Sequence, residues 1–297
     1  MRRQTWAAVT AAFIVVALAG CGTPAGTDGD VADDWQPMAQ AQQFTPKAGE
    51  CHVVPEDSGY LTSYAPVDCA KIHLVETFHI GTFTGTNAAR TSPPASGSTA
   101  MRGAFADCDK QAKQFVGGDW RNARLSLQVT PASPHGWNGG GRWYRCDIFE
   151  LNEEDGVNNR GDRAMERTGT LRGAAKNGSP LLHGCMTRDK WEFLRAAACT
   201  AVHQYEYAGI WNAPDRSFED ATRDEDAIHA KCRTVIARYA KVPVDANLRY
   251  RTGSTYVFPS RQLWERGDRG VRCYFYSSGD KIKRSIAGGG SKVLPIN

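Results

Sequence analysis

The sequence predicts an α+β fold made of two tandem, small, disulfide-stapled domains, each with one main helix packed on short, mostly antiparallel strands. Three observations lead to this prediction. Eight cysteines follow an export signal, four short blocks recur in the same order along the chain, and each recurrence mixes one helical pattern with several strand patterns. The chain has 297 residues, of which 41% are hydrophobic, and it is therefore long enough to bury a core in each domain.

The chain begins with an export signal. Arg2 and Arg3 precede an uncharged apolar run from Trp6 to Gly20, as in a secretory signal peptide. Residues 18–21 read Leu-Ala-Gly-Cys and match the bacterial lipobox, which implies cleavage after residue 20 and diacylation of Cys21. We therefore expect residues 1–20 to be removed. The mature protein is then a palmitate-type lipoprotein, anchored to the extracytoplasmic face of the cell membrane.

The segment that follows the lipobox is polar. Residues 21–47 are rich in Gly, Ala, Thr, Gln and Asp, and this composition predicts a disordered tether. Beyond the signal no apolar run approaches the ~20 residues that span a bilayer. Without the signal, 34 basic side chains face 32 acidic ones, and this balance gives no electrostatic reason to expect nucleic acid as a partner.

Four short blocks recur in the same order in residues 48–178 and 179–297. The first is the motif C-x3-H-x2-E, which occurs as Cys69, His73 and Glu76 and again as Cys199, His203 and Glu206. The second is a cysteine inside a helical pattern, Cys108 and Cys232. The third is a Trp nine residues before a cysteine, Trp137 with Cys146 and Trp264 with Cys273, and the fourth is residues 170–173 and 285–288. Such ordered blocks indicate a duplication.

Periodic patterns predict the elements of each copy. Apolar residues at steps of three and four predict helices around Cys108 and Cys232, with Ser98 and Ser217 as N-caps. Clusters of β-branched and aromatic residues predict strands at 75–83, 124–130, 143–151, 205–211, 248–252 and 271–277. The polar segment Asn152–Arg163 is expected to be a loop.

The duplication restricts the disulfides, because each copy is expected to close its own bridges, which leaves three pairings per copy. We favour a short and a long bridge in each. The preferred pairs are Cys51 with Cys69, Cys108 with Cys146, Cys185 with Cys199, and Cys232 with Cys273.

The order of these blocks resembles the septum formation-related domain, a family of secreted and lipid-anchored actinobacterial proteins. The resemblance rests on Gly-x-Cys at 49–51, C-x3-H-x2-E, the Cys-bearing helix, and the Trp before a terminal Arg-Cys. The second copy departs from it where His183-Gly184-Cys185 replaces Gly-x-Cys. The resemblance implies a link with division and cell-wall growth, and it implies no particular chemistry.

The candidate site residues are the two pairs His73 with Glu76 and His203 with Glu206, because neither a core nor a disulfide framework requires them. One interpretation is structural: the His bonds backbone in a turn, and the Glu caps or pairs with Arg145 or Arg272. A second is a ligand or partner surface. A third is a metal site, which lacks a repeated third ligand because His52, His79 and His229 are unmatched between copies. We expect no metal and no cofactor.

Aromatic side chains offer a second kind of contact. Trp137 and Trp264 stand beside Gly and Arg in predicted loops, and we expect them to be exposed and to contact a ligand. The sequence has no nucleophile elbow, zinc-protease motif or phosphate loop. The function that these observations favour is a non-enzymatic envelope module that binds an envelope protein or a wall polymer. The alternatives are a metal-assisted wall hydrolase and a spacer in which one copy packs on the other.

Overall fold

The computed structural model describes residues 44–54, 64–152, 163–190, 193–277 and 282–296. The expected signal peptide, Cys21, all but the last residues of the tether and most of the 152–163 loop lie outside these ranges. By their contacts, residues from Gln43 to Asn297 form one compact unit. Within the described part of the chain, no helix has both the length and the apolarity that a membrane crossing requires.

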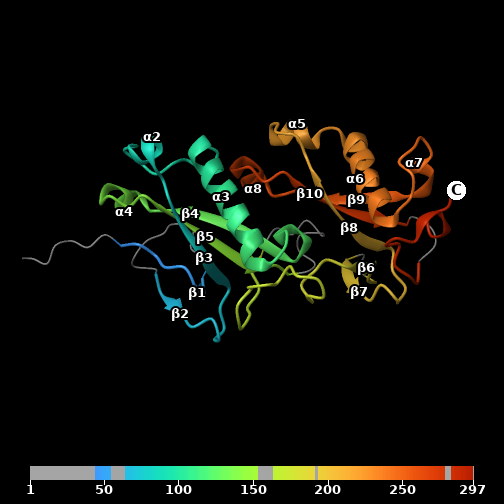
Figure 1. The fold of residues 1–297 in the computed structure, drawn as a ribbon, viewed down its shortest axis with the longest axis horizontal. Coiled ribbons are helices and arrows are strands. Elements are labelled where there is room, and N and C mark those ends of the chain that lie inside the picture. The colour runs from blue at the N-terminus through green and yellow to red at the C-terminus, as the bar shows by residue number, and fades with distance from the viewer. Residues whose placement is uncertain (1–43, 55–63, 153–162, 191–192, 278–281, 297) are drawn as a thin grey trace, which may run out of the picture. The chain divides into compact units, whose positions relative to one another are not determined.

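The first half of this unit is an antiparallel sheet in the order β2-β1-β3-β5-β4, with its helices on one side (Figure 1). Its strands are β1 (Glu50–His52), β2 (Pro66–Val67), β3 (Val75–Thr82), β4 (Leu125–Pro131) and β5 (Trp143–Glu150). Its helical segments are α2 (Gly85–Ala88), α3 (Thr99–Val116), the 3₁₀ turn η3 (Trp120–Asn122) and α4 (Pro134–Asn138).

The second half repeats the same strand order, β7-β6-β8-β10-β9, again antiparallel throughout. Its strands are β6 (Cys185–Arg188), β7 (Leu194–Ala197), β8 (Tyr205–Asn212), β9 (Gly253–Val257) and β10 (Gly270–Tyr276). Its helical segments are α5 (Phe218–Thr222), α6 (Glu225–Ala240), α7 (Leu248–Arg251), α8 (Arg261–Arg266) and the 3₁₀ turn η4 (Gly290–Lys292). Even the irregularities recur, because β3 skips Phe78 and β8 skips Ala208 in their pairing with the neighbouring strand.

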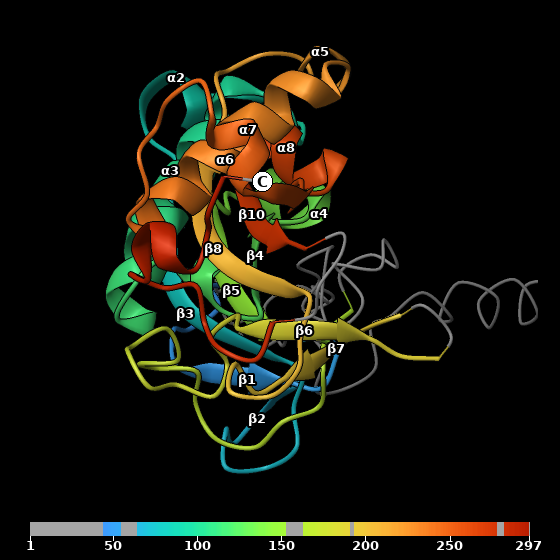
Figure 2. The same cartoon turned by 90° about the vertical axis from the view of Figure 1, so that its right-hand side faces the viewer.

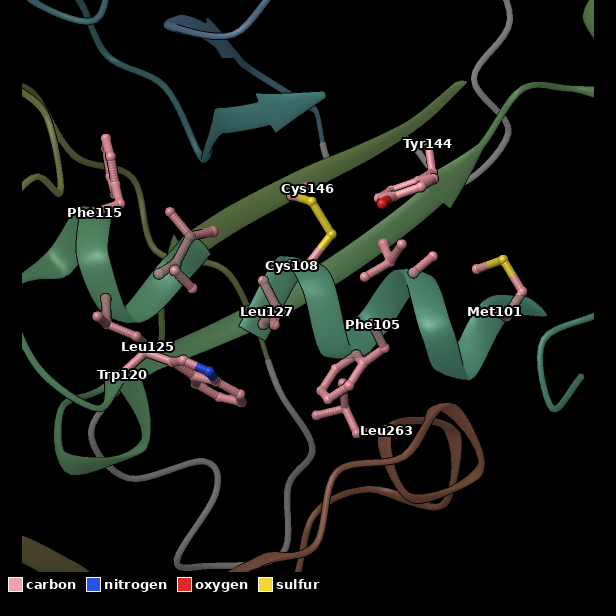
Figure 3. Packing of buried hydrophobic residues seen from close by; sticks show 14 of the residues in the cluster. Met101, Phe105, Cys108, Phe115, Trp120, Leu125, Leu127, Tyr144, Cys146 and Leu263 are labelled. Carbon is pink, nitrogen blue, oxygen red and sulfur yellow. A yellow bond between two sulfur atoms is a disulfide. The ribbon is translucent and has the colours of Figure 1, made fainter. Parts of the chain in front are cut away.

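Helix α3 forms where the sequence predicted it. The Ser98 hydroxyl accepts the Met101 amide hydrogen at its start, and Gly117 ends it in the left-handed region. Its apolar face carries Met101, Phe105 and Cys108 into the core, as Figure 3 shows. The disulfide from Cys108 to Cys146 then ties the middle of α3 to β5.

The corresponding helix of the second half is divided, which differs from the prediction. Ser217 does cap a helix, but that helix is the short α5, which ends at Thr222. A new helix, α6, begins after Asp224, whose carboxylate accepts the Ala227 amide hydrogen. Asp224 thus acts as a second N-cap after Ser217, and a separate helix begins at this point.

The strand predicted at 248–252 is wrong. Residues Leu248–Arg251 form the short helix α7, and the strand β9 begins at Gly253, opposite Tyr276 of β10. The alternation Leu-Arg-Tyr-Arg resembles a half-buried strand, but a turn at Asp245 and Asn247 captures the amide hydrogens of Leu248 and Tyr250. The other five predicted strands form, with ends shifted by one residue or so.

The four disulfides have the pairing that we expected. Two bridges lie in each half, one short and one long, with Cα–Cα distances of 5.1 to 5.5 Å. The short bridges fasten β1 and β6 to the turn before each His, and the long bridges fasten the main helix to the strand that carries Arg-Cys. The pairs are Cys51–Cys69, Cys108–Cys146, Cys185–Cys199 and Cys232–Cys273.

The two halves are in direct contact. Leu263 of α8 packs into the core of the first half, beside Phe105 of α3 (Figure 3). Arg121 of η3 is buried and donates from Nε to Asp268 of the second half at 2.7 Å. The connecting segment pairs with the first half as well, because the Arg124 amide donates to Leu181 at 2.8 Å. The halves therefore share buried surface, and Figure 2 shows the same elements from the side.

Candidate functional site

The His–Glu motif of the first half lies inside the protein. Glu76 is 4% exposed and accepts hydrogen bonds from the Thr170 hydroxyl and the Leu171 amide, each at 2.6 Å. His73 is 1% exposed, and its Nδ1 lies 2.8 Å from the Lys71 carbonyl oxygen. The carboxylate therefore holds the fourth repeated block of the sequence against the first.

The second half builds the same arrangement. Glu206 accepts from the Ile286 amide at 2.9 Å, from the Tyr239 hydroxyl at 2.6 Å and from the Ser285 hydroxyl. His203 Nδ1 lies 2.8 Å from the Ala201 carbonyl oxygen, as in the first half. The matching contacts at residues 170–171 and 285–286 explain why these two blocks recur together.

Both motifs fit the structural interpretation with one correction. The His does bond backbone in a turn, but among the described residues neither Glu pairs with Arg145 or Arg272, which was the alternative to a capping role. Arg145 instead donates to Asp147 at 2.7 Å, and Arg272 Nη1 lies 3.4 Å from His183 Nε2. A buried carboxylate that accepts two or three hydrogen bonds satisfies its oxygens without a cation.

Donor atoms do gather at both motifs, in the sets Cys51, Cys69, Glu76 and Cys185, His203, Glu206. The cysteine sulfurs in both sets belong to disulfides, so they offer no thiolate to a metal ion. The carboxylate oxygens already accept hydrogen bonds from protein groups. These donor sets therefore do not fit a zinc ion.

The expected exposure of Trp137 and Trp264 is wrong. Trp137 is 1% exposed in α4 and Trp264 is 2% exposed in α8. Each indole Nε1 donates to a main-chain oxygen, that of Arg90 at 2.8 Å and that of Arg216 at 2.9 Å. The Gly and Arg residues near each Trp suggested a loop. In the structure Arg142 lies over the Trp137 ring and Arg269 over the Trp264 ring, with the Arg142 guanidinium carbon 4.3 Å from the Trp137 ring centroid.

The first half contains a buried polar network that sequence reasoning did not find. Thr77 Oγ1 donates to Asp147 at 2.7 Å and lies 3.3 Å from His52 Nε2, while Arg145 pairs with the same carboxylate. Burial, with Arg145 and His73 nearby, lowers the pKa of His52 to about 4. All four members of the network are at most 2% exposed, so it organises the core and does not present a reactive surface. Its members come from three strands, and no short sequence motif contains them all.

A cavity of about 640 Å³ opens at the far edge of the second half, where no site was predicted. Its walls are the middle of α6, α7, the start of β9, the end of β10, and residues 293–295. Three arginines line it, Arg233, Arg249 and Arg251, together with Tyr250 and Tyr276. Its size lies in the range of small-molecule sites. Arg249 and Arg251 are near neighbours in the sequence, and the fold adds Arg233 of α6 to them.

Comparison with known proteins identifies the family. The family described as septum formation matches residues 48–273, a range that runs through both halves and covers most of the chain. No curated protein and no solved structure matches the chain. The match indicates a septum-related, extracytoplasmic role and an association with the cell envelope. The chain, with its two antiparallel sheets and four disulfides, therefore belongs to the septum formation family.

Proposed function

We propose that this chain is a lipid-anchored protein on the outer face of the cell membrane that binds a component of the envelope and catalyses no reaction. The binding partner is an envelope protein or a wall polymer at sites of growth or division. The observation that carries this proposal is the burial of both His–Glu motifs, whose carboxylates bond the protein's own residues 170–171 and 285–286. The family match supplies the link with the septum.

We also propose that residues 48–178 and 179–297 are two copies of one ancestral unit. The identical strand order, the equivalent bulges at Phe78 and Ala208, and the equivalent disulfides support this proposal. The contacts of Arg121 and Leu263 across the halves support a pair that acts together. The family match runs through both copies, in keeping with such a pair.

The anchor is tested by fractionation of cells that express Cys21→Ala. If Cys21 carries the lipid, this variant accumulates in the medium or in the soluble envelope fraction, while the wild type sediments with membranes. Retention of the variant in the membrane fraction would contradict the anchor. Wild-type protein treated with a lipase serves as a positive control for release.

The binding proposal is tested with the chain from residue 43, which contains the whole compact unit and all four disulfides. This protein is sedimented with purified cell-wall sacculi and, as a control, with an unrelated insoluble polysaccharide. Selective pelleting with sacculi supports a wall polymer as the partner. If the protein stays in the supernatant with both, the partner is not the wall, and crosslinking in living cells tests for an envelope protein.

The alternative function is a metal-assisted wall hydrolase that uses His73, Glu76, His203 and Glu206. The bonded carboxylates and the disulfide-linked sulfurs do not favour it. Stoichiometric zinc in the purified protein, bound through these residues, would contradict the non-enzymatic proposal. Glu76→Gln and Glu206→Gln distinguish the two functions, because a hydrolase would lose its metal while a structural carboxylate would lose stability.

A further inference from the structure

The arginine-lined cavity of the second half has an unusual electrostatic setting. Among the residues that the structure describes, no carboxylate pairs with Arg233, Arg249 or Arg251. Arg251 donates from Nη1 to the Leu294 carbonyl oxygen at 3.0 Å, but its Nε is buried without a hydrogen-bond partner. Arg249 donates from Nη2 to the hydroxyl of its neighbour Tyr250 at 2.5 Å, and its guanidinium lies over the ring of that residue. Three guanidinium groups therefore line one cavity with no carboxylate partner in the described part of the chain.

The equivalent positions of the first half carry different charges. Register makes Arg124 the counterpart of Arg251, because Val129 pairs with Cys146 as Tyr256 pairs with Cys273, and each arginine lies five residues earlier. In the first half Arg124 lies 3.6 Å from the carboxylate of Glu150. The residue four positions after the strand cysteine is Glu150 in the first half and Ser277 in the second. The residue that follows the helix cysteine is likewise Asp109 in the first half and Arg233 in the second.

Compared with the first half, these two positions of the second half carry two carboxylates fewer and one cation more. The second half as a whole is also basic, because residues 179–297 hold 19 Lys and Arg against 13 Asp and Glu, a net charge of +6. Residues 48–178 hold 14 against 15, a net charge of −1. The net charge of the whole chain is near zero, but that of the second half is positive and attracts anions.

The first half also shows that this edge accepts another chain segment. There, the amide of Arg124 donates to Leu181 and the carbonyl of Asn122 accepts from His183, so the connection between the halves covers the edge. In the second half residues 293–295 lie at this edge, where Leu294 accepts from Arg251, and they line the cavity of about 640 Å³. The edge that a chain segment occupies in the first half thus borders a cavity in the second half, and arginines line that cavity.

We propose that this cavity binds a phosphate-bearing ligand, a phosphorylated sugar or polyol of the cell envelope. A phosphate group offers several acceptor oxygens to guanidinium groups, which bind it through paired hydrogen bonds. The cavity is larger than a phosphate ion and has room for the attached sugar or polyol, beside the rings of Tyr250 and Tyr276. The proposal rests on the proposed function and names the class of polymer that the module would bind.

The direct test measures binding of poly(glycerol phosphate) to the chain from residue 43 by calorimetry. We expect Arg249→Gln and Arg233→Gln each to weaken binding about tenfold, because each removes one charge-assisted contact. The matched control is Arg223→Gln, which removes the same charge from an exposed pair with Asp220 outside the cavity. Absence of binding by the wild type, or equal losses in the control and in the cavity variants, would overturn the proposal.

Two further arms identify the source of the phosphate. Inorganic phosphate alone tests whether the organic part contributes, and vesicles of phosphatidylcholine with phosphatidylglycerol test a lipid headgroup. If vesicles bind the wild type and poly(glycerol phosphate) does not, the ligand is a lipid and the polymer assignment is overturned. Weaker binding of inorganic phosphate than of the polymer supports a ligand that fills the cavity.

Sacculi separate this proposal from the proposed function. Hydrofluoric acid removes phosphodiester-linked polymers from sacculi, so the protein should pellet with native but not with stripped sacculi. Pelleting with both would retain the wall-binding function and overturn the phosphate site. Pelleting with neither, together with Arg249-dependent binding of poly(glycerol phosphate), would retain the site and contradict the wall as the partner.

Discussion

Arg121 of η3 and Asp268, just after α8, form an ion pair inside the protein that joins the two halves of the chain. The Arg121 Nε atom lies 2.7 Å from Asp268 Oδ1, and both side chains are less than 10% exposed. Asp268 also accepts the Gly270 amide hydrogen at 2.9 Å, while Arg121 Nη1 reaches Asp109 at 2.6 Å. The residue five positions before the strand cysteine is Asp268 in the second half and Gly141 in the first, so this contact has no equivalent at Gly141.

We expect Asp268→Ala to destabilise the protein by about 3–5 kcal/mol, because it leaves the Arg121 guanidinium buried with one carboxylate fewer. Urea denaturation of the chain from residue 43 measures the loss. The matched control is Asp215→Ala, which removes an exposed carboxylate from Arg102 and Arg269 and should cost no more than about 1 kcal/mol. The exposed pair of Arg102 with Asp215 also joins the halves, so equal losses in the two variants would show that burial gives the Arg121–Asp268 contact no extra weight.

The buried carboxylates of the two motifs give a second prediction. Glu76→Gln should lower the free energy of unfolding by about 2–3 kcal/mol. The amide of Gln has one acceptor oxygen, so it cannot accept from both Thr170 and Leu171 as the two carboxylate oxygens do. Glu206→Gln should act in the same direction through Ile286. Denaturation curves of both variants measure the effect, and unchanged stability in both would contradict the structural role of these residues.

A third prediction concerns pH. Burial lowers the pKa of His52 from 6.5 to about 4, so between these values the unfolded chain binds a proton that the folded chain does not. This contribution to stability is complete above pH 6.5 and is lost as the pH falls, by about 3 kcal/mol at pH 4. Burial also lowers the pKa of His183, which adds a loss of the same sign.

Denaturation midpoints measured from pH 7.5 down to pH 4 test this dependence. His52→Gln keeps a group that can bond Thr77 but removes the titration, so its stability should fall less steeply with acid than that of the wild type. The comparison variant is His135→Gln, which removes an exposed imidazole of α4 outside the buried network. Parallel pH profiles of the wild type and His52→Gln would rule out His52 as the source.

The indoles provide a fourth prediction. Trp264→Ala should destabilise the second half by about 3–5 kcal/mol, because the ring fills a core with Phe218 and Phe258 around it. Trp264→Phe, which loses the hydrogen bond to Arg216, should cost less and should leave binding to sacculi unchanged. A folded Trp264→Phe variant that no longer pellets with sacculi would reinstate Trp264 as a contact residue.

The disulfides give a fifth prediction. Peptide mapping without reduction should recover no bridge between the halves. Removal of either long bridge by paired Ala substitutions should cost about 4 kcal/mol, since each closes a loop of similar length, with separations of 38 and 41 residues. A bridge that joins Cys146 to Cys273, for example, would contradict both the pairing and the duplication argument.

The local features of the fold could be predicted because they depend on neighbours in the sequence. The capping of α3 by Ser98 needs only an amide three residues away, and the strand at Val75 needs only its own apolar residues. The pairing of Cys108 with Cys146 could be predicted because the duplication reduced the choices in each half. Where two local signals compete, as at Asp224 and at Leu248, the turn or cap that the structure uses was not the one predicted.

The sites could be predicted only as far as the repeated residues reach. His73 and Glu76 were recognised, but their partner Thr170 lies 94 positions from Glu76, so no spacing rule connects them. The exposure of Trp137 was predicted wrongly because burial depends on what packs against a side chain, and that information is not local. The cavity with Arg249 was missed for the same reason.

By itself the sequence determined the recurrence of its short blocks, the cysteine pairing within each half, most helices and strands, and the family resemblance, because each follows from recurrence or from contacts between near neighbours. Only the tertiary structure decided that Glu76 bonds the chain itself, that Arg121 meets Asp268 across the halves, and that Arg233 and Arg251 line one cavity. These facts depend on which surfaces come together when the chain folds. Residues far apart in the sequence become neighbours through packing, and a pattern along the chain does not record it.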